Sequence, residues 1–406
     1  MSGRGGVEAM SIRSATWPFP ARIKTELQID TVLLTIVLAL LLGGFVILAS
    51  ASISISDNAA NNPFFYVQRQ LLAAVIGAAA GFICLFVPMQ VWRSLGLLLL
   101  FVGLALLFVV LVPGVGHEVN GSTRWLRLGV MNLQVSEPAR LCFLLYLAGY
   151  LVRRNKSLRD EFTGFLRPMI VITAACMLLL AEPDFGAAVV LLTTALVMMF
   201  VAGARIRDFL IFFAVAVIAM AALVLAAPYR MKRVTGFMDP WADPFNSGFQ
   251  LTQSLIAIGR GEWFGVGLGE SVQKLFYLPE AHTDFVFAVY AEEFGLVGSL
   301  VLIALFLALL WRIFRLAMRA ADAERFFEAY IATGLGTWLG IQAFINIGVN
   351  MGMLPTKGLT LPLISYGRSS LIITMICISL LLRIHHELAV DATPVNRKRR
   401  KRSKKS

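Results

Sequence analysis

Long apolar runs recur along nearly the whole chain, and they constrain its fold more than any other feature of the sequence. Each run is about 17 to 25 residues long, which is the length that a helix needs to cross the hydrocarbon core of a bilayer. Hydrophobic residues make up 58% of the chain and charged residues only 15%, a balance that excludes an ordinary soluble domain. The sequence therefore predicts an all-α, polytopic integral membrane protein.

We predict about ten transmembrane helices from these runs. The fifth and sixth are separated by Glu182-Pro183-Asp184, which interrupts what would otherwise be one overlong apolar run. A single span of that length would leave the connection near Asp208 on the wrong side of the membrane. The predicted spans are Val32–Ser52, Val67–Val87, Ser94–Val112, Pro138–Val152, Pro168–Ala181, Gly186–Ala202, Phe209–Ala227, Phe294–Phe314, Tyr330–Asn350 and Leu371–His385.

Lysine and arginine residues gather in alternate loops, which predicts the orientation of the bundle. They precede the first span and follow the fourth, sixth and eighth, so they all lie on one side of a ten-span arrangement. That side is the cytoplasm, with both termini in it, and the loops around 53–65, 113–136, 228–284 and 351–370 face outward. The basic residues are Arg13, Arg22, Lys24, Arg153, Arg154, Lys156, Arg159, Arg205, Arg207, Arg312, Arg315, Arg319 and Arg325.

The two ends of the chain are polar. Residues 1–29 are basic and lack an apolar core, so we expect a cytoplasmic segment without a cleavable signal peptide, followed by a membrane domain over 30–386. Residues 387–406 form a basic cytoplasmic tail whose last ten positions carry eight bases and no acid. Such a tail attracts anionic lipid head groups, and we predict that contact, with docking of a cytoplasmic partner as an addition, rather than nucleic-acid binding.

Three ionisable residues, Glu280, His282 and Asp284, fall within five positions of the stretch Leu278–Phe285, directly before a long apolar run. In so apolar a chain, this cluster is where chemistry on a polar group is expected, and Asp284 is the candidate catalytic residue. The cluster ends the large outward loop 228–284. Aromatic residues and glycines along that loop predict short amphipathic pieces on the membrane interface rather than disorder.

Two other outward segments carry candidate ligands for an anion. Arg124 lies in a loop that should be poor in positive charge, so either a bound phosphate or an ion pair explains it, with Glu118 or a carboxylate of the large loop as the partner. Lys357 lies in a segment with two prolines and two glycines, whose backbone must line a cavity or an interface. It is a second candidate phosphate ligand, or an interfacial lysine that reaches lipid head groups.

The fourth predicted span opens with a polar segment. Ser136 is in the position of a helix N-cap. Glu137 and Arg140 stand at i and i+3, which is close enough to pair. We interpret them as a structural pair, because a charge near the membrane is costly without a partner.

Seven short motifs carry a resemblance to a known family. They are Leu278–Phe285, Glu292-Glu293-Phe294-Gly295, Gln253-Ser254-Leu255-Ile256-Ala257-Ile258-Gly259, Pro355–Pro362, Ser365-Tyr366-Gly367, Arg124-Trp125 and Glu182-Pro183-Asp184-Phe185-Gly186. Together they resemble the SEDS family (shape, elongation, division and sporulation) over roughly residues 30 to 385. Within that family, residues 277–282 and 353–358 are similar to the cell-division branch rather than to the elongation branch.

The resemblance implies a peptidoglycan glycosyltransferase that polymerises lipid II at the division septum, outside the cytoplasmic (inner) membrane of a bacterium, and releases undecaprenyl pyrophosphate. It also implies an undecaprenyl-linked glycan as the other substrate, and a class B penicillin-binding transpeptidase and further division proteins as partners. The membrane domain over 30–386 then corresponds to the SEDS glycosyltransferase domain. The essential aspartate of that family matches Asp284.

The chemistry of chain growth fits these residues. A sugar hydroxyl must attack an anomeric carbon and expel a highly charged pyrophosphate, and Asp284 suits the general base for the hydroxyl. Arg124, Lys357 and Arg233 suit the departing pyrophosphate. We expect no organic cofactor. A divalent cation, Mg²⁺ or Mn²⁺, would be held jointly by Asp284 and the pyrophosphate.

The motif around Ser365 adds two candidate substrate-binding residues, Ser365 itself and Arg368. Arg368 stands where members of the family usually have a glycine, and it adds bulk and charge at a helix start that faces the anionic substrate. Either it strengthens substrate binding, or it is a damaging or regulatory substitution.

Three neighbours of Asp284 are interpreted as supporting residues: Glu280, His282 and Thr283. If a helix starts at Pro279, Glu280 and Asp284 share a face, and their repulsion favours proton uptake by one of them. Alternatively, Glu280 caps the helix start and takes no part in the chemistry. His282 makes an orienting hydrogen bond, or it acts as a proton shuttle or a metal ligand.

Two rival functions come from other classes. In a transporter that flips lipid II, the helix break at Glu182-Pro183-Asp184 would be the strongest sign. In a scaffold that only recruits division proteins, the outward carboxylates would be dispensable. Neither rival explains why the strongest polar cluster lies in an outward loop.

Overall fold

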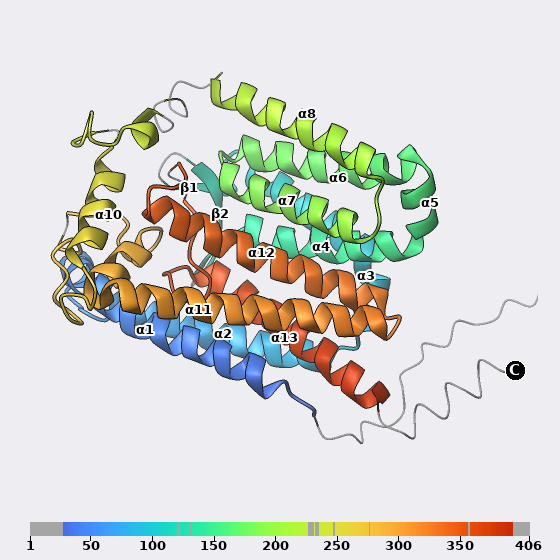
Figure 1. Cartoon of the computed structure of the whole chain (residues 1–406), viewed down its shortest axis with the longest axis horizontal. Helices are drawn as coiled ribbons and strands as arrows, with labels where there is room; N and C mark the ends of the chain where they lie inside the picture. Colours follow the sequence, from blue (N-terminus) through green and yellow to red (C-terminus); the bar gives the residue numbers. More distant parts are fainter. Residues whose placement is uncertain are drawn as a thin grey trace, which may run out of the picture.

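Each predicted span overlaps a helix of the computed structural model, and the all-α class is confirmed (Figure 1). The structure describes residues 27–119, 122–129, 131–225, 231, 235–246, 248–275, 277–355 and 358–392. The helices that overlap the predicted spans are α1 (Thr31–Ala60), α2 (Phe65–Phe86), α3 (Met89–Val110), α4 (Ser136–Arg153), α6 (Phe162–Ala181), α7 (Phe185–Val201), α8 (Ile206–Leu225), α11 (Val286–Asp322), α12 (Phe326–Asn350) and α13 (Arg368–Ala392).

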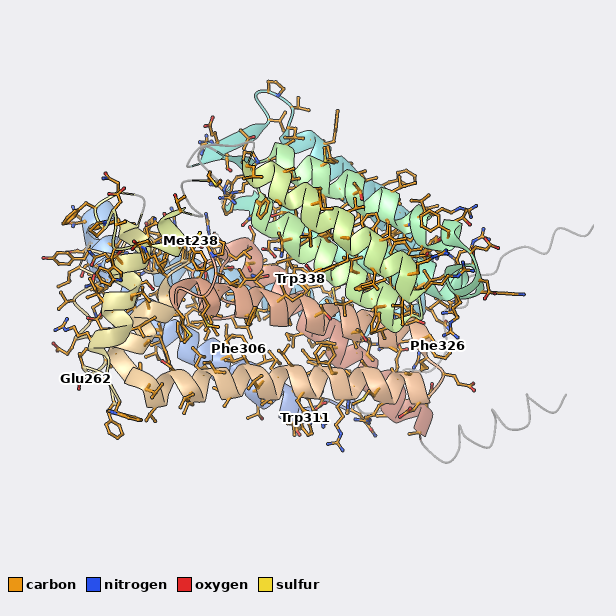
Figure 2. The ribbon with its side chains drawn as sticks, turned by 45° about the horizontal axis from the view of Figure 1, so that its top comes forward. Met238, Glu262, Phe306, Trp311, Phe326 and Trp338 are labelled. Atoms are coloured by element: carbon orange, nitrogen blue, oxygen red, sulfur yellow. The ribbon has the colours of Figure 1, made fainter. Side chains whose placement is uncertain are left out.

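Six of these helices are long and apolar enough to cross a membrane: α1, α2, α3, α6, α11 and α13. Their outer faces carry exposed apolar side chains, as expected where lipid replaces water. In Figure 2, Phe306 and Trp311 lie on opposite sides of α11, and Phe306 is buried in the bundle while Trp311 is 58% exposed. The chain is therefore a multi-pass membrane protein.

Two central helices, α4 and α12, are buried along most of their length. Their neighbours are protein rather than lipid, because α4 packs against α3, α7 and α12. Polar side chains such as Gln342 and Asn346 are consequently accommodated inside the bundle, where other protein groups can satisfy them. These two helices hold most of the polar groups discussed below.

A small sheet occupies the outward segment for which the sequence predicted only a loop. Strands β1 (Gly116–Val119), β2 (Ser122–Leu128) and β3 (Met131–Gln134) pair antiparallel in the order β1-β2-β3. The edge of β3 rests on α13, where the Ser369 hydroxyl accepts a hydrogen bond from the Gln134 amide at 2.9 Å. The sheet therefore fixes β2, and with it Arg124, against the bundle.

Two further helices lie at opposite ends of the molecule: α5 (Asn155–Asp160) and α10 (Phe249–Arg260) (Figure 1). Helix α10 belongs to the large loop and buries Leu251 and Ala257. The turn that follows it exposes Phe264, at 81%. Exposed aromatic side chains suit an interfacial location, but contact of this loop with the membrane surface stays a prediction.

Helix α11 breaks at Gly295, whose φ of 65° and ψ of −162° are not helical. The break leaves backbone N–H groups without helical acceptors, and the large loop supplies them. The amides of Leu296 and Val297 donate to the carbonyls of Glu262 and Trp263 at 2.9 and 3.0 Å. The large loop is thereby joined to α11 by its backbone, which satisfies groups that lipid could not.

Buried ion pairs anchor the same loop on its other side. Glu292 accepts hydrogen bonds from Arg260 at 3.0 Å and from the Ser271 hydroxyl. Glu293 pairs with the buried Lys274 at 2.9 Å and accepts from Ser50 of α1. These contacts fix the part of the loop that leads into residues 277–285.

The opposite end of the bundle is closed by a second set of ion pairs. Asp30, before α1, pairs with Arg312 of α11 at 2.8 Å. Arg325, before α12, contacts Glu387 and Asp391 near the end of α13. The first and last described residues therefore lie at the same end of the bundle, as the predicted topology requires (Figure 1).

Candidate active site

Asp284 lies in a turn directly before α11, at the end of the bundle that carries the sheet and α10. Its backbone carbonyl accepts hydrogen bonds from the side-chain amides of Asn346 and Asn350, at 2.8 and 2.9 Å. Its side chain is only partly buried. The residue is thus held by its main chain and is only partly buried.

The segment after α12 that contains Gly358 and Leu359 lies close to the Asp284 carboxylate. A β-carbon built on Gly358 would lie 3.1 Å from Asp284 Oδ2, so the glycine permits a close contact that a larger residue would crowd. The segment continues to Leu359, whose side chain packs on Gly186 at the start of α7. Asp284 is therefore bordered by the segment that follows α12, and that segment in turn packs on the start of α7.

The sequence interpretations of Glu280 are corrected by the structure. Helix α11 begins at Val286, and Phe285 is in its N-cap position without a side-chain cap. Glu280 has a left-handed φ of 57°, so a helix cannot run from Pro279 through it. Glu280 and Asp284 consequently share no helix face, and Glu280 caps no helix.

Glu280 instead closes the turn that precedes α11. Its exposed carboxylate accepts a hydrogen bond from the Thr283 hydroxyl at 2.6 Å. Its carbonyl accepts from the amides of Thr283 and Phe285, at 3.1 and 3.2 Å. Glu280 and Thr283 therefore shape the turn that presents Asp284.

His282 is buried against two tyrosine rings, Tyr66 at 4.6 Å and Tyr366 at 5.7 Å between ring centroids. Its carbonyl accepts from the Tyr366 amide at 2.9 Å, and its Nδ1 atom has no hydrogen-bond partner within the described ranges. Burial lowers the pKa of His282, and the negative charge of Glu280 acts in the opposite direction. Within the described part of the chain, His282 is tied to its surroundings by this backbone bond and by ring packing, and not by the predicted side-chain hydrogen bond.

Arg124 has an acidic neighbour that the sequence did not suggest. Its guanidinium lies 3.8 Å from Asp184, and neither Glu118 nor a carboxylate of the large loop is that partner. Asp184 also caps α7, accepting from the Ala187 amide at 3.1 Å, and accepts from the Ser136 hydroxyl at 3.0 Å. Arg124 Nε is buried and has no hydrogen-bond partner in the described part of the chain.

The expectation that Ser136 caps α4 is wrong. Val135 occupies the N-cap position of α4, and no side chain caps the helix there. The Ser136 hydroxyl turns instead to Asp184, on the neighbouring connection between α6 and α7. A tertiary contact has replaced the local one that the sequence pattern favours.

Glu182, in the same connection, is fully buried. Neither of its carboxylate oxygens has a hydrogen-bond partner among the residues that the structure describes. Burial and, to a smaller extent, the charge of Asp184 raise the pKa of Glu182 to about 9, although the charge of Arg124 acts in the opposite direction. Glu182 is therefore protonated and neutral at physiological pH.

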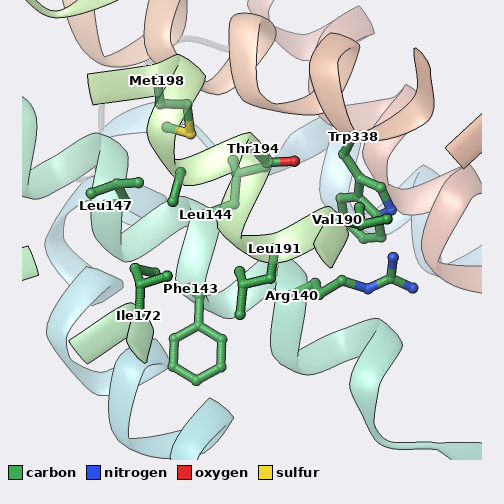
Figure 3. Close-up of a pocket in the computed structure, with 11 residues that line it drawn as sticks. Arg140, Phe143, Leu144, Leu147, Ile172, Val190, Leu191, Thr194, Met198 and Trp338 are labelled. Atoms are coloured by element: carbon green, nitrogen blue, oxygen red, sulfur yellow. The ribbon is translucent and has the colours of Figure 1, made fainter. Parts of the chain in front are cut away.

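Glu137 and Arg140 form a buried ion pair on α4. The Arg140 guanidinium also lies over the ring of Trp338, 4.7 Å from its centroid, and donates to Gln342 at 3.4 Å. Figure 3 shows Arg140 and Trp338 beside a small apolar cavity. The other residues that line the cavity are Phe143, Leu144, Leu147, Ile172, Val190, Leu191, Thr194, Ala195 and Met198.

Ser365 and Arg368 occupy different environments. The buried Ser365 hydroxyl accepts from the Leu361 amide at 2.8 Å, and its carbonyl accepts from Gln70 of α2 at 3.1 Å. Ser365 therefore shapes the segment before α13. Arg368 is the first residue of α13, partly exposed and near Tyr366. The predicted ligands Arg233 and Lys357 lie outside the described residues.

The sequence interpretation missed the three amides of α12 that hold this site: Gln342, Asn346 and Asn350. Asn346 and Asn350 contact Asp284, while Gln342 donates to the Thr360 carbonyl at 3.0 Å. A signal for them was present. Three amide side chains at intervals of four residues inside an apolar span indicate one polar stripe that faces protein.

A family model described as "Cell cycle protein", covering FtsW, RodA and SpoVE, matches residues 30–389. A "Probable peptidoglycan glycosyltransferase FtsW" of Thioalkalivibrio sulfidiphilus is 54% identical over 389 residues, which is 96% of each chain. A protein of the same description from Alkalilimnicola ehrlichii is 53% identical over 373 residues, covering 92% of this chain and 93% of its own.

Solved structures show the same fold. One chain, from work described as "Structural coordination of polymerization and crosslinking by a peptidoglycan synthase complex", aligns with a TM-score of 0.74 at 33% identity. The alignment covers 89% of the present chain and 99% of the other. The rod shape determining protein RodA of Thermus thermophilus aligns with a TM-score of 0.65, also at 33% identity, over 89% and 98% of the two chains.

Proposed function

The chain belongs to the FtsW/RodA/SpoVE family of cell cycle proteins, and on that premise we propose that it polymerises lipid II with Asp284 as the general base. The protein is a peptidoglycan glycosyltransferase. The position of Asp284 supports the finer proposal: its backbone is held by two buried amides, and the residue is only partly buried at the end of the bundle predicted to face outward. A base must be both fixed and reachable to take a proton from a substrate.

In the proposed reaction, a sugar hydroxyl of one lipid-linked chain attacks the anomeric carbon of another. A new glycosidic C–O bond forms, and the bond between the anomeric carbon and the pyrophosphate oxygen breaks. The bonding electrons leave with undecaprenyl pyrophosphate, and the hydroxyl proton passes to the carboxylate of Asp284. Proton removal by a positioned base commonly contributes about 10² to 10⁴ in rate.

Positive groups would stabilise the departing pyrophosphate. Arg124 suits this role because its ion pair with Asp184 is loose, at 3.8 Å. Its Nε atom also has no protein acceptor among the described residues. Arg368, at the start of α13, suits a second contact. Arg233 and Lys357 stay in the proposal on the strength of the sequence alone.

A divalent cation would need the substrate for its coordination. Within the described ranges, no group of three or more His, Cys, Asp or Glu side chains could hold a metal ion. Asp284 then offers a single carboxylate, and the oxygens of the pyrophosphate would complete the shell, as Mg²⁺ often allows. We propose this shared arrangement, and no step above depends on it.

The proposed partner is a class B penicillin-binding transpeptidase, and the proposed place of action is the division septum, with both termini in the cytoplasm. The similar solved chain belongs to a peptidoglycan synthase complex, which supports an assembly of this kind. The relatives named FtsW support the division branch. Removal of residues 397–406 tests the proposed contact of the tail with anionic lipid.

Labelled lipid II supplied to the purified complex with its transpeptidase tests the function directly. We expect glycan polymer from the native chain and a loss of about 10² or more from Asp284→Ala and Asp284→Asn, because both remove the base. Glu280→Gln is the matched control, since Glu280 is exposed and bonded to Thr283, and we expect its rate to stay close to native. Equal polymer from native protein and Asp284→Asn would refute the assignment of the base.

The same preparation separates the rival functions. A flippase would move lipid II across a vesicle membrane without polymer, and a scaffold would do neither. The structure places Glu182-Pro183-Asp184 in a connection between α6 and α7, each of which overlaps its own predicted span. That connection joins two helices, so it does not break a single span as the discontinuous helices of many transporters do.

A further inference from the structure

Helix α12 carries a stripe of three buried amides: Gln342, Asn346 and Asn350. They are 2%, 1% and 0% exposed, and they follow one another at intervals of four residues, so they lie on one face of the helix. Polar side chains inside a membrane bundle are costly unless they are hydrogen-bonded. The hydrogen-bond partners of these three amides therefore indicate their role.

Asn346 uses both hydrogens of its amide nitrogen on two segments that lie far apart in the sequence. One goes to the Asp284 carbonyl at 2.8 Å, and the other goes to the Leu359 carbonyl at 2.7 Å. Two carbonyl acceptors also settle the orientation of the amide, because its oxygen could not replace the nitrogen there. One side chain thus ties the turn before α11 to the segment after α12.

The neighbouring amides complete the arrangement on either side. Asn350 donates to the Asp284 carbonyl at 2.9 Å, and its oxygen accepts from the Ala288 amide at 3.1 Å. Gln342 donates to the Thr360 carbonyl at 3.0 Å. Of the two described segments, Asn350 therefore bonds only to the α11 side and Gln342 only to the segment after α12, while Asn346 bonds to both.

The bonds made by Asn346 also determine how close Gly358 lies to the Asp284 carboxylate. Gly358 directly precedes Leu359, and a β-carbon on it would lie 3.1 Å from Asp284 Oδ2. Since Asn346 holds the Asp284 backbone and the Leu359 backbone together, it also holds Gly358 beside the Asp284 carboxylate. Movement of either backbone would change the direction in which that carboxylate points.

We infer that Asn346 is a positioning residue, which fixes Asp284 against the Gly358–Thr360 segment and so aims its carboxylate at the substrate hydroxyl. This inference rests on the proposed role of Asp284 as the base. A displacement of about 1 Å at a reacting group can cost about 10²-fold in rate. Loss of the connection therefore lowers kcat, while the affinity for substrate, which depends on other groups, changes little.

The test compares Asn346→Asp with Thr337→Val in the complex with the transpeptidase. Aspartate has nearly the shape of asparagine but no N–H donor, so the Leu359 carbonyl loses its bond to residue 346 and the Asp284 carbonyl keeps only its bond from Asn350. Thr337 lies on the same helix, is buried, and its hydroxyl has no hydrogen-bond partner in the part of the chain that the structure describes, which makes it a matched control. The measurements are kcat and KM with labelled lipid II, thermal melting, and hydrogen exchange of residues 284–288 and 358–361.

We expect Asn346→Asp to lower kcat about 10- to 100-fold with KM within about threefold, and to speed hydrogen exchange in both segments. Thr337→Val keeps native values. Asn350→Ala speeds exchange near Asp284 but not at 358–361, because Asn350 makes no bond to that segment. An unchanged kcat for Asn346→Asp, or a loss of kcat that only follows the loss of folded protein, overturns the inference.

Asp284→Asn is measured in parallel, so that the two proposals can fail separately. If Asp284→Asn keeps the native rate, the base assignment fails and with it the catalytic meaning of Asn346. Hydrogen exchange still decides whether Asn346 joins the two segments. If Asp284→Asn is inactive but Asn346→Asp is not, the base stands and the positioning role falls.

Discussion

Gly358 lies against the carboxylate of Asp284: a β-carbon at residue 358 would be 3.1 Å from Oδ2. That separation is tighter than almost all ordinary contacts of a β-carbon, so either the carboxylate or the backbone must move by a few tenths of an ångström. Absence of a side chain at this position is therefore part of the geometry around the proposed base. The segment of Gly358 and the turn of Asp284 meet only through the tertiary fold.

Gly358→Ala should lower the rate of polymerisation by about 10-fold, because it shifts Asp284 from its position without removing it. The measurement is initial rate with labelled lipid II at saturating substrate. Gly259→Ala is the matched control, since nothing lies within 4 Å of a β-carbon there. A Gly358→Ala protein as fast as Gly259→Ala would show that the carboxylate needs no such room.

Gly295→Ala should lower the stability of the folded protein, because residue 295 is strained and crowded for any residue other than glycine. Residue 295 has a φ of 65°, and a β-carbon there would lie 2.4 Å from the backbone nitrogen of Gly265. Strain of this backbone conformation costs about 1 to 3 kcal/mol for a residue other than glycine, and the clash adds to it. The measurement is thermal melting in detergent, with Gly43→Ala as the control, because nothing lies within 4 Å of a β-carbon at Gly43. Equal melting of the two variants would contradict the argument.

The sequence predicted the helical elements well, because an apolar run of membrane length leaves the chain few other structures. It predicted β1, β2 and β3 poorly, since strands of 4, 7 and 4 residues in an outward segment give little periodic signal. The sheet forms where Gln134 can bond to Ser369, and that contact depends on α13 being in place.

The candidate site was predicted in part, and the missing part is tertiary. Asp284 could be singled out by its charged neighbours in the sequence, but its contacts with Asn346 and Gly358 join segments that are distant in the chain. The partner of Arg124, Asp184, was missed for the same reason. Glu280 was misplaced because its left-handed backbone, which few residues other than glycine adopt, gives no sign in the sequence.

Arg140→Ala should cost about 3 to 5 kcal/mol of unfolding free energy, because it leaves Glu137 buried without its partner. Glu137→Gln alone should also destabilise, since Arg140 then keeps a buried charge. The double variant Glu137→Gln/Arg140→Ala should lose less than the sum of the two single changes, because it removes both charges together. Thermal melting of the three variants decides this, and strictly additive losses would mean that the two residues do not interact.

Glu182→Gln should make the stability of the protein less dependent on pH. The pKa of Glu182 is raised to about 9 in the folded chain, from an ordinary value of 4.5. Between these values the folded state keeps a proton that the unfolded state has released, so the native protein loses stability as pH rises. One such proton corresponds to about 1.4 kcal/mol per pH unit, or about 3 kcal/mol between pH 6 and pH 8.

Glutamine resembles the neutral acid and cannot ionise, so the Glu182→Gln protein should gain on the native protein at pH 8 and differ least near pH 5. Asp184 and Arg124 are the charged groups that act on Glu182, and both stay in place in this variant. Glu118→Gln is the control, because Glu118 is an exposed carboxylate on β1. Melting temperatures from pH 5 to pH 8 give the result, and parallel curves for native and Glu182→Gln protein would mean that Glu182 is already ionised in the folded state.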